Sequence, residues 1–530
     1  MSKIIIWANA ESGGEQIILE TSMLTRHWLI TWATWTGKTV SLQVLAETLS
    51  LEWIPVFTAD VKWDLAWLAF KWETNKHITK RVDYIWLETH PQPFPLKIPS
   101  HSLGQAQEGS SFEFKNFPTI FWDIYWKKWH SVRTTISEMW PMLLSKLLDL
   151  SNVQDAILHI IFKFADDSWY LLLDIKDLKS LLKHFLENEK EIEKEYWNIT
   201  PASITSILRQ LLILEDKWWD IFFGEPALDI NDLFKKDFNW NWVISILDSS
   251  ELMKDIWIYS VFLLFLLSEL FEKLPEVWDL EKPKLVFFFD EAHLIFRDAP
   301  RVLINKIESV IRLIRSKWIW IFFVTQNPLD IPENIRWQLW NRIAHAMRVF
   351  TPKEEKAARI VANTFRQNTN INPEILLREL KVWYSLVSTL DSDWRPTKVK
   401  HIMMRPPMSR MWSITENERL EIISRSPIWT KYDNLLDRES AYEILKELKS
   451  KSLHSQSLEW DANQEWDFYK DKEIDNTSSE SNLFWTLLKT ITQKNWRRQS
   501  YLESFTKNIL RKVWTKVANS IVRWIFGSMK

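Results

Sequence analysis

The chain has 530 residues, 46% of them hydrophobic, and a formal net charge of −2, which is enough apolar material for about two to four domains. It contains no cysteine, which excludes disulfides and cysteine-based metal sites and is compatible with a cytoplasmic location. The longest apolar run, residues 258–271, is shorter than the about 20 residues of a membrane span, and the first residues do not form a signal peptide, so no transmembrane segment is expected.

Tryptophan and glycine are present in unusual numbers, 35 and 7 respectively. Together they make up about 8% of the chain, close to the about 7% that glycine alone normally contributes. Tryptophan also follows Asn or Asp where a turn is expected, as at Trp240 and Trp394, and such turns are served by glycine. One hypothesis is that UGA, which some bacterial lineages read as glycine, has been translated as tryptophan, with Trp122 in an apolar strand a genuine exception. The alternative is a protein truly rich in tryptophan, and the codons at these positions decide between them.

Strand-like runs alternate with helical stretches along the chain, which is typical of an α/β fold with a mostly parallel sheet. A strand at residues 27–31 leads through a loop into a helix at residues 39–49. Further strands are predicted at residues 54–62, 118–125, 242–248, 284–291, 318–326, 342–350 and 383–390. Residues 285–289 are apolar throughout, as expected of a central strand covered on both faces.

Shifts in composition predict the domain organisation. In chain order the parts are a short N-terminal segment (1–27), an α/β core (28–125 and 239–410) interrupted by a helical insertion (126–238), a C-terminal helical extension (411–449), a disordered acidic linker (450–490) and a basic amphipathic helix (491–530). Residues 494–530 contain nine Lys or Arg and one acid. A helix of this kind suits nucleic acid, an acidic partner or an anionic membrane, or is simply a solvated terminal helix.

The stretch WATWTGKTV ends as a phosphate-binding loop, because Gly37-Lys38-Thr39 stands between an apolar strand and a helix. Lys38 is expected to reach the β- and γ-phosphates of ATP, and the Thr39 hydroxyl to hold Mg²⁺. The loop pattern requires glycine where Trp32 stands, so the loop is intact if Trp32 and Trp35 are glycines. The expected nucleotide-binding residues are Trp32, Ala33, Thr34, Trp35, Thr36, Gly37, Lys38, Thr39 and Val40.

The apolar run at residues 284–289 ends in Asp290 and Glu291, which is typical of a Walker B strand. Asp290 would bind Mg²⁺, and Glu291 would polarise the attacking water. Gln326 ends the next strand, where a polar side chain senses the γ-phosphate. Glu291, Lys38 and Gln326 are therefore the expected catalytic residues.

In ring-shaped motors an arginine from a neighbouring subunit completes the site. Arg312 and Arg315 precede the strand that ends at Gln326 and are the first candidates, with Arg342 and Arg348 behind them. Any of them is otherwise a surface or salt-bridging arginine. The letters DEAH also occur in a helicase class with two tandem motor domains and a late arginine-glycine motif, but neither is found in this sequence.

With tryptophan read as glycine, these motifs resemble the bacterial HerA-like helicase family, which is related to the HerA and FtsK motors. The resemblance covers about residues 26–440. Its motifs occur in the family's order and include RHWLITWATWTGKT (26–39), FTADVKWDLAWLA (57–69) and LEKPKLVFFFDEAHLIF (280–296).

The resemblance implies a RecA-like P-loop NTPase core, ATP with Mg²⁺, and a homo-hexameric ring around double-stranded DNA. It also places the arginine finger at Arg315. Two features depart from the archaeal relatives. Residues 1–27 are too few for their N-terminal β-barrel, and the net charge provides no global basic field for DNA. Local Lys and Arg patches would then have to contact the phosphates.

The leading hypothesis is an ATP-hydrolysing DNA translocase or helicase-like motor. The alternative is a P-loop ATPase that changes conformation as a scaffold or regulator without moving along DNA. A third hypothesis is a coupling ATPase at a membrane, anchored by the basic C-terminal helix. A further, unidentified protein partner is left open.

Overall fold

The computed structural model describes residues 3–450 except 11–15, 21–25, 33–36, 62–64, 73–113, 189–198, 217–221, 238–240, 253–255, 278–279, 297–300, 392 and 429. The chain divides into two units, residues 1–450 and 451–530, and the second lies outside the described residues. Apart from Ser450, the predicted acidic linker and the predicted basic helix fall in that second unit.

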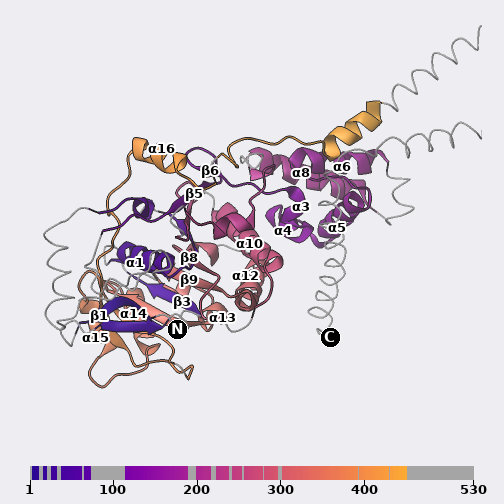
Figure 1. The fold of residues 1–530 in the computed structure, drawn as a ribbon. Helices are drawn as coiled ribbons and strands as arrows, with labels where there is room; N and C mark the ends of the chain where they lie inside the picture. The colour runs from indigo at the N-terminus through magenta and orange to yellow at the C-terminus, as the bar shows by residue number, and fades with distance from the viewer. Residues whose placement is uncertain are drawn as a thin grey trace, which may run out of the picture. The chain divides into compact units, whose positions relative to one another are not determined.

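The core of the first unit is a twelve-stranded sheet with the order β2-β1-β12-β11-β10-β3-β9-β8-β4-β7-β5-β6. Figure 1 shows its central strands β3, β8 and β9. The strands from β10 to β6 are parallel, and those from β2 to β10 are antiparallel. Their bounds are β1 (Lys3–Asn9), β2 (Gln16–Glu20), β3 (His27–Thr31), β4 (Val56–Asp60), β5 (Thr119–Asp123), β6 (His130–Ser131), β7 (Ile244–Asp248), β8 (Leu285–Phe289), β9 (Ile319–Thr325), β10 (Leu339–His345), β11 (Tyr384–Ser388) and β12 (Lys400–Met404). The sheet is thus mixed and mostly parallel, as predicted.

Successive residues of the central strands pack on opposite faces of the sheet, because side chains alternate along a strand. In β8, Val286 and Phe288 belong to the core beside α1 (Lys38–Leu51), whereas Phe287 belongs to the core on the other side. The second core is covered by α10 (Ile256–Lys273) and α12 (Arg301–Leu313). Both faces are therefore buried, which explains the continuous apolar sequence of β8 and β9.

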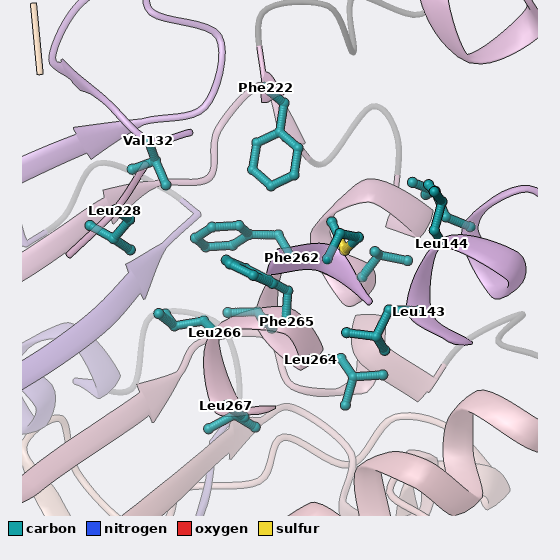
Figure 2. Packing of buried hydrophobic residues seen from close by; sticks show 14 of the residues in the cluster. Val132, Leu143, Leu144, Phe222, Leu228, Phe262, Leu264, Phe265, Leu266 and Leu267 are labelled. Carbon is teal, nitrogen blue, oxygen red and sulfur yellow. The ribbon is translucent and has the colours of Figure 1, made fainter. Parts of the chain in front are cut away.

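Helices α3 (Ile136–Met139), α4 (Pro141–Leu147), α5 (Asn152–Asp167), α6 (Ile175–Glu187) and α8 (Pro201–Asp216) lie between β6 and β7 in the chain. Capping boxes fix two of their starts, at Ser151 for α5 and at Asp174 for α6. Figure 2 shows α10 packed against this region, with Phe262 and Phe265 near Phe222 and with Leu264 near Leu143. One continuous core thus joins these helices to the sheet.

The remaining elements cover the antiparallel end and the linking turns. They are η2 (Ala66–Ala69), η3 (Ile230–Phe234), α11 (His293–Phe296), η5 (Ile314–Lys317), η6 (Pro328–Asp330), α13 (Glu333–Arg336), α14 (Pro352–Asn363), α15 (Pro373–Glu379) and α16 (Glu416–Ser424). α14 and α15 pack with β10 and β11 in a third, smaller core.

A segment that we call the strap, residues 405–442, crosses the molecule after β12. It begins on α1, where Arg405 Nη1 donates to Glu47 Oε2 at 3.0 Å and Ser409 N donates to Glu47 Oε1 at 2.9 Å. It ends at the helices between β6 and β7, where the backbone N–H of Tyr442 donates to Asp177 Oδ1 at 2.9 Å. Glu47 and Asp177 are both fully buried, so each anchors the strap inside the protein.

The predicted strands were mostly too long, and four strands were missed. The prediction at residues 342–350 was wrong at both ends, because β10 runs from Leu339 to His345 and the chain then leaves the sheet, with Met347 N donating to Leu377 O. The missed strands are β1, β2, β6 and β12. β1, β2 and β12 form the antiparallel end of the sheet, and β6 has two residues.

Positive backbone φ angles are concentrated at tryptophan. Nine non-glycine residues in the described part of the chain have positive φ, and seven are tryptophans: Trp53, Trp126, Trp140, Trp169, Trp318, Trp383 and Trp394. Their φ values lie between 52° and 74°. This left-handed region disfavours every residue with a Cβ and is populated routinely by glycine.

Candidate active site

The phosphate loop lies between the end of β3 and the start of α1. Trp32 N donates to Thr325 O of the neighbouring β9 at 3.3 Å, so the loop leaves the sheet in register with that strand. Gly37 is the N-cap of α1 with φ 107°, and a Cβ there would lie 2.8 Å from Cδ1 and 3.1 Å from N of Trp383. Glycine is required at this position on both counts. Ala33, Thr34, Trp35 and Thr36 lie outside the described residues.

Lys38 is buried at the first turn of α1 and forms an ion pair with Asp290. Its Nζ also lies 3.9 Å from Glu291 Oε1 and 4.5 Å from the centre of the Trp32 ring. The fold therefore brings the lysine of the predicted loop to the two predicted acids, which are 252 residues away in sequence for Asp290. Thr39 follows in the same turn and is half-buried, and Val40 is buried in the core beside α1.

Asp290 and Glu291 directly follow β8 and are each 3% exposed. Asp290 Oδ1 accepts a hydrogen bond from Glu291 N at 2.9 Å, and its carbonyl accepts one from the Tyr259 hydroxyl of α10 at 3.3 Å. Glu291 has φ 49°, a left-handed conformation that ordinary residues adopt mainly at turns and functional sites. Burial, together with Asp290 and Glu291, raises the pKa of Tyr259, which keeps its hydroxyl protonated as a donor.

Gln326 meets Glu291 because β8 and β9 are adjacent and parallel, with Phe289 opposite Phe323. Gln326 Nε2 lies 3.4 Å and 3.5 Å from the two carboxylate oxygens of Glu291. Nδ1 of His293 lies 3.5 Å from Glu291 Oε2. Lys38, Asp290, Glu291 and Gln326 thus form one group at the carboxyl edge of the sheet.

Three further aspartates end neighbouring strands at the same edge, namely Asp60, Asp123 and Asp248. The carboxylate of each accepts a hydrogen bond from the backbone of the loop that follows its own strand. Asp60 Oδ2 accepts from Leu65 N at 2.8 Å, Asp123 Oδ2 from Lys127 N at 2.9 Å, and Asp248 Oδ1 from Ser250 N at 3.0 Å. Asp290 and Glu291 differ from them because they face the lysine of the phosphate loop.

Arg315 is not part of this group. It lies in η5, before the first residue of β9, whereas Gln326 follows the last residue. Seven residues of strand span about 23 Å at about 3.3 Å each, so Arg315 stands at the opposite edge of the sheet and is too far from its own site. Arg312 and Arg348 are exposed, and Arg342 is held in β10 by bonds to the carbonyls of Leu339 and Thr364.

Sequence reasoning missed the histidine behind the phosphate loop. His345 ends β10, and its Nδ1 lies 3.3 Å from Tyr384 O, a pure acceptor, so its Nε2 accepts from the Ser41 hydroxyl of α1 at 2.9 Å. Burial lowers the pKa of His345 to about 4, so the ring is neutral at pH 7. No motif identifies such a residue, because its contact with Ser41 depends on the order of β10 and β3 in the sheet.

The oxygen ligands that the protein offers at this site fit Mg²⁺ but would fill only part of its coordination shell. The Thr39 hydroxyl and the Asp290 carboxylate are oxygen ligands, and Mg²⁺ commonly takes one or two protein oxygens together with waters and phosphate oxygens. Among the described residues no group of three or more His, Asp or Glu is arranged to hold a metal. Any ion here would therefore depend on the nucleotide for its remaining ligands.

A strand, a phosphate loop and a helix whose buried lysine meets two acids at the end of a neighbouring parallel strand define a P-loop ATPase with a RecA-like core. The model of the family described as "Helicase HerA-like C-terminal" matches residues 6–106 and 97–530, and the chain belongs to this family. It is an ATP-hydrolysing enzyme, a motor ATPase of the HerA/FtsK type. No curated protein sequence matches the chain.

Solved structures with similar folds are distant. A bacterial conjugative coupling protein, TrwB lacking its first 70 residues, in complex with sulphate, is 10% identical over 78% of this chain and 97% of its own, with a TM-score of 0.47. VirB4 of Thermoanaerobacter pseudethanolicus is 13% identical over 76% and 96%, with a TM-score of 0.45. TrwB in complex with a non-hydrolysable GTP analogue is 11% identical over 74% and 88%, with a TM-score of 0.42.

No helix among the described residues is long and apolar enough to cross a membrane.

Proposed function

We propose that the chain is an ATP-driven DNA translocase or helicase-like motor that works on double-stranded DNA as a ring, a homo-hexamer, in the cytoplasm where DNA and ATP are found. The observation that carries the hydrolytic part is the meeting of Lys38 with Asp290 and Glu291. Membership of the HerA-like family supports the motor and the ring.

In the proposed mechanism ATP binding separates the buried ion pair between Lys38 and Asp290. The ammonium group turns to the β- and γ-phosphates, and the Asp290 carboxylate becomes available to the ion that accompanies the nucleotide. Thr39 and Asp290 would hold that Mg²⁺, which supplies charge neutralisation at the phosphates. The separation leaves neither charge buried without a partner, because each exchanges one buried partner for another.

Glu291 is proposed to orient and deprotonate the attacking water. Its carboxylate already lies within reach of the Gln326 amide, and the amide would report the presence of the γ-phosphate to β9. Arg315 is proposed to act on the nucleotide of the adjacent subunit, since the length of β9 keeps it from its own site.

The test is the response of ATP hydrolysis to DNA. A motor on double-stranded DNA should hydrolyse ATP faster with DNA present, and the stimulation should fall as salt rises, because binding to phosphates releases counterions. An equal rate with and without DNA at low salt would refute translocation and would favour a conformational scaffold or regulator. Variant Glu291→Gln, expected to bind ATP without hydrolysing it, is the control for contaminating ATPases.

We also propose that the tryptophans at positive φ are glycines in the native protein, encoded by UGA. The concentration of left-handed backbone at these residues supports this, since indole side chains have no reason to favour it. Peptide masses of the protein made by its source organism would test the proposal. Tryptophan masses at Trp318 and Trp383 would refute it.

A further inference from the structure

His27 is a buried histidine at the edge of the sheet opposite the nucleotide site. It is the first residue of β3 and is 1% exposed. Nδ1 accepts a hydrogen bond from Ile321 N of β9 at 3.0 Å, and Nε2 lies 2.9 Å from Ile311 O of α12. A backbone N–H only donates and a carbonyl only accepts, so the ring is fixed as the tautomer protonated on Nε2.

These two bonds join three segments that each lead to a predicted functional residue. β3 ends at the phosphate loop, and β9 ends at Gln326. α12 continues into η5, where Arg315 lies four residues, about one helical turn, after Ile311. The imidazole therefore ties the rear of the phosphate-loop strand to the turn that presents Arg315.

A neutral imidazole suits this place for two reasons. It is a donor and an acceptor at once, so one side chain serves both the carbonyl of Ile311 and the N–H of Ile321. The guanidinium groups of Arg315 and Arg26 are close enough to disfavour a further positive charge on His27. Burial foremost, with these arginines adding to it against the opposing effect of the Ile311 bond, lowers the pKa of His27 to about 3.

We propose that His27 is a positioning residue for Arg315. Through its two hydrogen bonds, His27 passes movements of the phosphate-loop strand β3 to the arginine that is presented to the next subunit. The inference rests on the proposed trans-acting role of Arg315. Binding or release of ATP shifts β3 at the loop, and because β3 is rigid and its first residue holds α12, the turn carrying Arg315 shifts with it. Hydrolysis in one subunit would in this way depend on the occupancy of its neighbour.

Two substitutions separate the two hydrogen bonds of His27. The amide nitrogen of His27→Gln reaches the place of Nε2 and keeps the bond to Ile311 O. The amide oxygen of His27→Asn reaches only the place of Nδ1 and keeps the bond to Ile321 N while losing Ile311. Both variants are polar and close in size, so they form a matched pair. Each substitution is made in the full chain. Of the two versions of that chain, with tryptophan or with glycine at the positions of positive φ, the one that hydrolyses ATP is used.

We expect His27→Asn to lower kcat at least tenfold, which corresponds to a barrier higher by about 1.4 kcal/mol or more. Its KM for ATP should stay within about twofold of that of the parent. His27→Gln should retain most of kcat. Mixing inactive Glu291→Gln with His27→Asn should restore activity above the sum of the two alone. The Glu291→Gln subunit cannot hydrolyse ATP but still binds it, so it presents a well-placed arginine to its neighbour. Arg315→Ala mixed with Glu291→Gln is the reference.

The outcomes distinguish the inference from the function on which it rests. Restoration with Arg315→Ala but not with His27→Asn would overturn the role of His27 and leave the trans arginine standing. Restoration with neither would overturn the trans arginine and the inference with it. Equal loss in His27→Asn and His27→Gln, or a large rise in KM, would make His27 an ordinary core residue and would also overturn the inference.

Discussion

Lys38 and Glu291 share one buried site but are expected to fail in different ways when substituted. Lys38→Ala removes the cation for the β- and γ-phosphates, so ATP binding and hydrolysis should both be lost. Glu291→Gln keeps the shape and the Gln326 contact but removes the base, so ATP should still bind while kcat falls by about 10²–10⁴-fold. Equilibrium binding of a fluorescent ATP analogue and phosphate release measure the two effects.

The matched control is Asp248→Asn at the same edge of the sheet. The Asp248 carboxylate closes its own loop through Ser250, and an asparagine oxygen can accept the same bonds, so hydrolysis should stay close to that of the parent. Turnover by Glu291→Gln at the parent rate, or its loss in Asp248→Asn, would contradict the assignment of the site.

Two exposed tryptophans allow the proposal about glycine to be measured as stability. Trp169 and Trp412 are each 61% exposed, but only Trp169 has positive φ. Trp169→Gly relieves a left-handed backbone, about 1–2 kcal/mol, against an entropic loss of about 0.5–1 kcal/mol, so it should raise the unfolding free energy by about 0.5–1 kcal/mol. Trp412→Gly has only the entropic loss and should lower the unfolding free energy. Urea unfolding of both variants measures the two changes, and equal destabilisation would contradict the proposal that Trp169 stands at a glycine position.

The buried histidines should make stability depend on pH. The pKa values of His27 and His345 lie at about 3 and about 4 in the folded protein, below the ordinary 6.5, so the unfolded chain binds protons more readily. Their contribution to the unfolding free energy is complete above pH 6.5 and falls as pH decreases towards the folded values, by about 1.4 kcal/mol per pH unit for each. Urea titrations at pH 7, 6 and 5 should show a shallower decline in His345→Gln than in the parent.

At the scale of elements, the strap holds the phosphate-loop helix through one buried carboxylate. Glu47 on α1 is 0% exposed and accepts hydrogen bonds from Arg405, Met408 N and Ser409. Glu47→Ala leaves Arg405 buried without its anion, which should lower the unfolding free energy by about 3–5 kcal/mol. Replacing Glu47 and Arg405 together by leucine should lower the unfolding free energy by less than the sum of the losses from the two single substitutions.

The exposed pair of Glu421 on α16 and Arg425 at its C-cap is the control for this cycle. Their side chains are also ion-paired, at 2.6 Å, but solvent screens them, so Glu421→Ala should change stability by less than about 0.5 kcal/mol. Denaturant unfolding gives both values. A loss for Glu47→Ala no larger than that for Glu421→Ala would show that the strap contributes little.

The sequence predicted the parallel part of the sheet well because β3, β8 and β9 are buried on both faces and their central residues are apolar. The antiparallel end was harder. β12 is a five-residue strand with the sequence KHIMM, whose first residues are polar, and neither its pairing with β1 nor its position could be read locally. Strand pairing across about 400 residues is decided by the whole fold.

The candidate site divides in the same way. Lys38, Asp290, Glu291 and Gln326 were predicted because each stands at a motif position, and the structure brings them together. Tyr259, His27 and His345 were not, since their contacts depend on which helix or strand lies beside another. Their roles, like those of the motif residues, are proposals to be tested as above.

At the scale of the whole molecule, the separation of Arg315 from its own site makes assembly the decisive property. Glu291→Gln should accumulate with ATP bound and should form a closed ring under those conditions. We expect native mass spectrometry of this variant with ATP and Mg²⁺ to show six copies, and Lys38→Ala to show fewer because it does not hold the nucleotide. A monomer at all protein concentrations would contradict the ring.

The pairing of β1 with β12 has a consequence for synthesis on the ribosome. Trp7 of β1 is opposite Met404 of β12, so β1 waits for nearly 400 further residues before this edge is covered. At about 5–20 residues per second that interval is about 20–80 s. Meanwhile β1 and β2 can form only a hairpin, in which the edge of β1 that β12 later covers is also open, and open edges promote aggregation. Chaperones that shelter nascent chains would thus be needed most while β1 and β2 wait for β12.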